Sequence, residues 1–108
     1  MSASRIDAVR DGLFRATTYV DTLDLGFSQF FIRSPHGDVL CVETGTRANF
    51  TQLSAALDAV GIAPSMVSNV IVPHFEADEM GALPDFLAAN PALVAYASLL
   101  TGDRCAAE

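Results

Sequence analysis

The feature that most constrains the fold is a compact apolar run over residues 66–72, which Pro73 ends. A run this short, apolar and rich in β-branched residues predicts a buried strand. Apolar residues recur every three or four positions on either side of it, over residues 47–60 and 80–89, which predicts two amphipathic helices. Pro84 fits the second helix only in or near its first turn, because proline lacks the N–H that a helix interior needs.

Aromatic and β-branched residues predict further strands over residues 13–20, 27–33, 38–43 and 93–98. The second and third of these are joined by Ser34-Pro35-His36-Gly37, a turn sequence that predicts a β-hairpin and an exposed His36. Strands therefore precede an alternation of helix and strand, which predicts an α/β domain with a mixed sheet and helices on one side. We expect residues 1–12 to be a mobile polar lead-in and residues 13–108 to form one domain.

Composition excludes several classes of partner. The 108 residues carry a net charge of −7, and the six basic residues are all arginines scattered along the chain. This argues against nucleic acid and anionic membrane surfaces, which need clustered positive charge. No apolar run is long enough to span a bilayer, and the polar start does not resemble a secretory signal, so we expect a cytoplasmic protein. Cys41 is then a buried thiol, and a disulfide with Cys105 is the less favoured alternative.

One dense cluster of ligand-type residues follows the apolar run: His74-Phe75-Glu76-Ala77-Asp78-Glu79. In an extended segment the imidazole and the carboxylates at 74, 76 and 78 would share one side. At about 6 Å and an effective dielectric of about 20, two such carboxylates repel by roughly 2–3 kcal/mol, which a divalent cation would reverse. The alternative is that Asp78 is an N-cap and Glu79 a first-turn acid of the next helix.

The cluster resembles the metallo-β-lactamase superfamily, whose motif at the end of a core strand is H-x-H-x-D-H. Glu76 stands at the second His position, a form typical of the oxygen-binding di-iron branch, the flavodiiron proteins. The family's Asp-Thr-Gly turn is similar to Glu43-Thr44-Gly45, and the resemblance covers about residues 13–98. It implies that residues 13–108 are the N-terminal part of a metallo-β-lactamase-like domain, half of an αββα sandwich.

The resemblance also implies a set of metal ligands. His74 and Glu76 would bind one iron and Asp78 the other, with zinc as the alternative metal. Glu79 takes the place of the last His of the motif, and Glu43 that of a structural Asp. The family's complete fold needs more chain and supplies another His, a bridging Asp and a final His. We therefore expect weak or absent metal binding in this chain, and no FMN site, since a flavodoxin-type phosphate loop is lacking.

Three functions remain open at this stage. The first is a di-iron oxidoreductase module that binds or reduces O₂ or NO, and the second is a metal-dependent hydrolase of the same superfamily; either is an enzyme only if completed by further chain. The third is a metal-free interaction module. We also expect a homo-oligomer or a missing C-terminal half, because the second layer of the sandwich is absent. The candidates for its exposed apolar face are Phe14, Phe30, Ile32, Leu40, Val42, Val70 and Val72.

Overall fold

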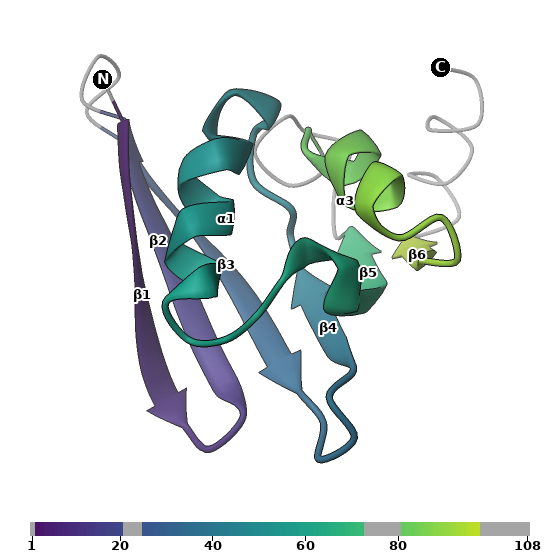
Figure 1. Ribbon diagram of the computed structural model, residues 1–108. Helices are drawn as coiled ribbons and strands as arrows, with labels where there is room; N and C mark the ends of the chain where they lie inside the picture. The colour runs from purple at the N-terminus through teal and green to yellow at the C-terminus, as the bar shows by residue number, and fades with distance from the viewer. Residues whose placement is uncertain (1, 21–24, 73–80, 98–108) are drawn as a thin grey trace.

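A six-stranded sheet, with its strands in sequence order, organises the chain (Figure 1). The structure, a computed structural model, describes residues 2–20, 25–72 and 81–97. Its strands are β1 (Ser2–Arg10), β2 (Leu13–Val20), β3 (Leu25–Arg33), β4 (Val39–Val42), β5 (Val67–Val72) and β6 (Val94–Ala97). Strands β1 to β4 pair antiparallel, whereas β5 pairs parallel with both β4 and β6. The prediction of a mixed sheet is therefore confirmed.

In the described parts of the chain, two helices lie in the crossover connections that parallel strands require. Helix α1 (Phe50–Asp58) follows the 3₁₀ turn η1 (Arg47–Asn49) and joins β4 to β5, while α3 (Leu83–Ala89) lies between β5 and β6. Pro84 falls in the first turn of α3, as predicted. Both helices cover the same face of the sheet (Figure 1), where Phe86 of α3 packs edge-on against Phe50 of α1 at 5.1 Å between ring centroids. The helices predicted over 47–60 and 80–89 are thus shorter than expected but correctly placed.

The hairpin predicted between the strands at residues 27–33 and 38–43 is present, and it joins β3 to β4. The Gly37 N–H donates to the Ser34 carbonyl over 3.0 Å, and the Ser34 N–H donates to the Asp38 carbonyl over 2.8 Å. Gly37 has a φ of +97°, which only glycine adopts easily. His36 lies exposed in this turn, as predicted.

Strand β1 corrects the polar lead-in predicted over residues 1–12. Its residues pair antiparallel with β2, with Ile6 opposite Ala16 and Ser4 opposite Thr18. The hydroxyls of Ser4 and Thr18 lie 2.8 Å apart, and Ile6 packs against the core. The sequence of this segment is largely polar because only alternate residues of β1 face the helices. Pairing with β2 satisfies the hydrogen bonds of its backbone.

Strand β5 begins one residue later than the predicted 66–72 run, because Met66 belongs to the 3₁₀ turn η2 (Pro64–Met66). Its register against β4 jumps from Val39–Val67 to Leu40–Asn69, which leaves Ser68 as a β-bulge. The bulge lets Val67 and Val70, three residues apart, both face the helices.

The observed strand pairings correct part of the apolar face that was predicted to be exposed. Val70 and Val72 are buried beneath the helices, and Phe14 is buried opposite Phe31. The other candidates, Phe30, Ile32, Leu40 and Val42, lie on the opposite face as expected, by the alternation along β3 and β4. The core itself is built from the largest fully buried side chains, among them Phe31, Phe86, Leu53, Leu57 and Ile62.

Within the described parts of the chain, neither helix has the length and apolar character to cross a membrane.

Candidate metal centre

The predicted ligands His74, Glu76 and Asp78 lie in residues 73–80, outside the described part of the chain. What the structure describes is the frame on either side of them. The chain reaches this segment from the end of β5 at Val72 and is described again from Gly81, just before α3. The contacts of these two flanks define where the segment is attached.

The first flank is attached through Glu43, immediately after β4. The Glu43 N–H donates to the carbonyl of Ile71 in β5 over 3.0 Å. Glu43 has a φ of +68°, the left-handed region that side chains other than glycine rarely adopt. Such a conformation costs about 1–3 kcal/mol and persists only where surrounding contacts enforce it. The strained residue is therefore hydrogen-bonded to the end of β5, which in the sequence directly precedes the predicted ligands.

The second flank is attached through the next two residues of the same turn. The Ala82 N–H is shared between the Thr44 hydroxyl, at 3.1 Å, and the Gly45 carbonyl, at 3.0 Å. The Thr44 hydroxyl in turn donates to the Gly45 carbonyl over 3.0 Å, and Thr44 is fully buried. Three consecutive residues, Glu43 to Gly45, thus hold both ends of the segment that carries the predicted ligands.

This attachment lies at the carboxyl ends of the parallel strands β4 and β5, which end at Val42 and Val72. Ligand sites of α/β sheets form preferentially at this edge, because the loops that follow parallel strands converge there. The position is therefore suitable for a binding site built from residues 73–80.

The thiol of Cys41, beside this turn, is not suited to bind metal. Cys41 is a free cysteine, fully buried in β4, and its Sγ donates to the Glu43 carbonyl over 3.2 Å. Burial, and then the negative charge of Glu43, raise the pKa of the Cys41 thiol well above its usual range. Because metal binding needs the thiolate, Cys41 acts here as a small apolar core residue.

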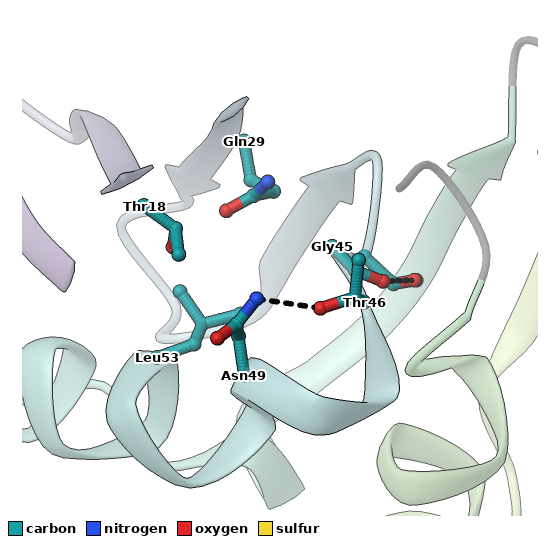
Figure 2. Close-up of a pocket in the computed structure, with 7 residues that line it drawn as sticks. Thr18, Gln29, Gly45, Thr46, Asn49 and Leu53 are labelled. Carbon is teal, nitrogen blue, oxygen red and sulfur yellow. Dashed lines mark hydrogen bonds between the residues drawn. The ribbon is translucent and has the colours of Figure 1, made fainter. Parts of the chain in front are cut away.

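A small polar pocket lies beneath the turn, between the sheet and the start of α1 (Figure 2). Its lining includes Thr18, Gln29, Gly45, Thr46, Asn49 and Leu53. The Asn49 amide donates to the Thr46 hydroxyl over 2.6 Å, the dashed bond of Figure 2. Gln29 is only 1% exposed, and its Nε2 has no hydrogen-bond partner among the residues that the structure describes. An unpaired buried amide of this kind costs about 1–3 kcal/mol.

Gly45 is required at the wall of this pocket. Its φ is +78°, and a Cβ there would lie 3.2 Å from Cδ and 3.3 Å from Nε2 of Gln29. The amide of Gln29 therefore fills the space that any other residue at 45 would need. The pocket offers amides and hydroxyls, with no titratable side chain in its lining, so it supports the turn and has no acid or base for catalysis.

The Glu43-Thr44-Gly45 turn was predicted from the sequence, whereas Gln29 and the attachment of Ala82 were not. Gln29 could have been found, because it alternates in phase with the buried Phe31 along β3. The bond from Thr44 to Ala82 joins residues 38 positions apart and has no signature in the sequence. Within the residues that the structure describes, no three His, Cys, Asp or Glu side chains form a group that could hold a metal ion.

Comparison with known proteins gives a match in structure only. No protein-family model matches the sequence, and no curated protein matches it. Among solved structures, a metallo-β-lactamase from Cronobacter sakazakii with a HARLDQ motif superposes with a TM-score of 0.79 and 18% identity, over 95% of this chain and 38% of that one. The chain has a metallo-β-lactamase fold. Its mixed sheet with helices on one face is half of that fold's αββα sandwich, as predicted from the sequence.

Two further structures show the same fold at low identity. The FEZ-1 metallo-β-lactamase from Legionella gormanii has a TM-score of 0.71 and 14% identity, over 87% of this chain and 34% of that one. A fragment of a putative diflavin flavoprotein from Nostoc sp. PCC 7120 has a TM-score of 0.76 and 14% identity, over 99% of this chain and 46% of the fragment. The chain thus spans less than half of the length of each structure.

Proposed function

We propose that residues 73–80 form part of a di-metal site, in which His74 and Glu76 hold one metal ion and Asp78 holds the other. The observation that carries this proposal is the double attachment of the segment, at Ile71 to Glu43 and at Ala82 to Thr44 and Gly45. A loop fixed at both ends loses less conformational entropy when its side chains converge on an ion. One imidazole with two carboxylates suits iron, manganese or zinc.

We further propose that the complete protein is an oxidoreductase of the di-iron type. Glu76, at the position where the superfamily motif has a second His, supports this assignment, and so does the structural likeness to the putative diflavin flavoprotein from Nostoc. Two bound iron ions would supply the redox chemistry for binding or reducing O₂ or NO. Three ligands are too few for two ions, so this activity requires ligands from further chain.

A metal-dependent hydrolase is the second candidate function. The observation that favours it is the structural likeness to two metallo-β-lactamases, from Cronobacter and from Legionella. Its metal would activate a bound water as the nucleophile. The identity of the preferred metal separates the two functions, since iron favours the first and zinc the second.

Paramagnetic Mn²⁺ tests the site even when binding is weak, because it broadens the NMR signals of nearby amides. On titration of Mn²⁺ into the ¹⁵N-labelled chain, we expect the amides of Thr44 and Ala82 to broaden first. The hairpin turn at Gly37 lies at the opposite end of β4 and should keep its signals. Competition of Mn²⁺ with Fe²⁺ under anaerobic conditions, and in a separate experiment with Zn²⁺, then ranks the three metals by their affinity for the site.

Two histidine variants make the test specific, since the chain has only two histidines. The selective broadening should be lost in His74→Ala and kept in His36→Ala, which removes the exposed imidazole of the hairpin turn. Broadening that is spread over exposed carboxylates such as Asp38, or that is unchanged in His74→Ala, would contradict the proposed site.

A further inference from the structure

The turn between β1 and β2 contains Asp11-Gly12, the only aspartate in the sequence that a glycine follows. Strand pairing fixes both sides of the turn, since Arg10 lies opposite Leu13. The turn lies at the same end of the sheet as the β3–β4 turn (Figure 1), away from the carboxyl ends of β4 and β5. Asp11 is exposed, and its carboxyl group makes no ion pair with any residue that the structure describes. Water and the neighbouring main chain can therefore both reach this carboxyl group.

The peptide group that joins Asp11 to Gly12 has no hydrogen bond within the described part of the chain. Neither the Asp11 carbonyl nor the Gly12 N–H has a partner there. Gly12 has a φ of +76° and carries no Cβ, so no side chain shields its nitrogen. This peptide group can therefore turn until the Gly12 nitrogen faces Cγ of Asp11, and it breaks no strand hydrogen bond in doing so.

Asp38 is a second exposed aspartate at the end of a hairpin turn, and the peptide group that follows it is held. The Asp38 carbonyl accepts a hydrogen bond from the Ser34 N–H over 2.8 Å. The next residue, Val39, is fully buried and β-branched, so its side chain crowds its own nitrogen. The two aspartates thus differ in how freely the following nitrogen can approach the carboxyl group.

We propose that Asp11-Gly12 is a site of spontaneous isomerisation to isoaspartate. The Gly12 nitrogen attacks Cγ of the protonated Asp11 carboxyl group. The N–Cγ bond forms, the bond from Cγ to the hydroxyl breaks, and the hydroxyl leaves with the N–H proton as water. Water then opens the resulting succinimide ring at the main-chain carbonyl of Asp11, which breaks the bond from that carbonyl to the Gly12 nitrogen. One water is lost and one is regained, so the mass is unchanged and no other reactant is needed.

The isomer has a main chain that is longer by one methylene group immediately before Gly12, which packs tightly against Arg33. The Gly12 carbonyl accepts the Arg33 N–H over 2.7 Å, and a Cβ on Gly12 would lie only 2.8 Å from the Arg33 carbonyl oxygen. The Arg33 side chain also donates to the Val60 carbonyl over 3.0 Å and lies over the Phe14 ring at 5.2 Å. We therefore expect isomerisation to break the bond from Arg33 to Gly12. The proposal does not rest on metal binding.

Incubation of the folded chain at 37 °C and pH 6 for several weeks tests the site. Isoaspartate is measured by enzymatic methylation with an isoaspartyl methyltransferase and is located by fragmentation in a mass spectrometer. We expect at least about fivefold more isoaspartate at Asp11 than at Asp38. Equal amounts at the two positions in the folded chain, with an excess at Asp11 only after unfolding in urea, would overturn the proposal, because the fold would then protect Asp11.

Hydrogen exchange tests the structural consequence in the isomerised fraction, isolated by ion-exchange chromatography. The Arg33 amide should exchange at least about tenfold faster than in the fresh chain. The Ala82 amide, which is bonded to Thr44 and Gly45 at the other end of the sheet, should keep its rate. An unchanged Arg33 amide in the isomerised fraction would contradict the expected loss of its bond to Gly12.

Two variants of Asp11 make the test specific. Asp11→Glu should form no isomer at this position and keep the Arg33 exchange rate after incubation, because its side chain would have to close a larger and less favourable ring. Asp11→Asn should form the same succinimide faster, with loss of ammonia in place of water. Circular dichroism confirms that both variants are folded. An Arg33 amide that accelerates equally in incubated Asp11→Glu and wild type would show that isomerisation is not the cause.

Discussion

The backbone N–H of Ala82 donates to the Thr44 hydroxyl over 3.1 Å, which joins two residues 38 positions apart in the sequence. The same N–H also reaches the Gly45 carbonyl, at 3.0 Å. Through this shared bond, the turn that follows β4 fixes the point at which the chain enters α3. In the sequence, the candidate metal ligands lie between this point and the end of β5.

The first prediction concerns the Thr44 hydroxyl. Thr44→Val keeps the shape of the side chain but removes the buried hydrogen bonds, and we expect the free energy of unfolding to fall by about 1–2 kcal/mol. The Ala82 amide should exchange its hydrogen faster, because one of its two acceptors is gone. Urea denaturation and native-state hydrogen exchange measure the two effects.

Thr51→Val is the control for this change, because Thr51 is exposed on α1. It should alter the free energy of unfolding by less than about 0.5 kcal/mol. If both variants were equally stable and the Ala82 amide stayed equally protected, the Thr44 hydroxyl would not hold the turn to α3.

The second prediction separates two demands on Gly45. Gly45→Ala must adopt a φ of +78° and also place its Cβ 3.2 Å from Cδ of Gln29, whereas Gly37→Ala meets a φ of +97° with no atom within 4 Å. The left-handed conformation alone costs about 1–2 kcal/mol in both variants. The contact with buried Gln29 should add about 1–3 kcal/mol to the cost of Gly45→Ala.

Chemical denaturation of the two glycine variants measures this difference. Shortening the neighbour, in the double change Gly45→Ala with Gln29→Ser, should recover part of the added cost by removing the clash. An equal loss of stability in Gly45→Ala and Gly37→Ala would show that Gln29 can move aside freely.

The third prediction concerns pH and the buried thiol of Cys41, whose pKa is raised by burial and then by Glu43. Above an ordinary thiol pKa of about 8.5, the unfolded chain releases this proton while the folded chain keeps it. The buried Cys41 thiol therefore contributes its full share of the stability of the folded chain below that pH. As the pH rises above it, this contribution to the free energy of unfolding is lost by about 1.4 kcal/mol per pH unit.

Urea denaturation between pH 8 and pH 10 measures this loss. Cys41→Ala should remove the thiol's share of the pH dependence, although its cavity lowers stability at every pH. Cys105→Ala should leave the dependence as in the wild type. The folded wild-type chain should also react slowly with a thiol reagent at Cys41. A slope that is identical in all three proteins would show that Cys41 titrates normally.

The sequence by itself determined the local elements. Three of these elements depend on contacts between near neighbours in the chain. They are the turn at residues 34–37, the helical periodicity that buries Leu53 and Leu57, and the apolar run that became β5. The turn at Glu43-Thr44-Gly45 was also identified from the sequence, and the His74-x-Glu76-x-Asp78 pattern remains a prediction from the sequence.

Only the tertiary structure decided what depends on strands that are distant in sequence. Ser2–Arg10 is a strand because β2 offers an edge to pair with, although the segment is polar at alternate positions. The bulge at Ser68 follows from the register of β5 against β4, and it decided that Val70 and Val72 face the helices while Ile71 does not. Because side chains alternate along a strand, one unpaired residue reverses the face of all that follow, and no local pattern specifies where that residue lies.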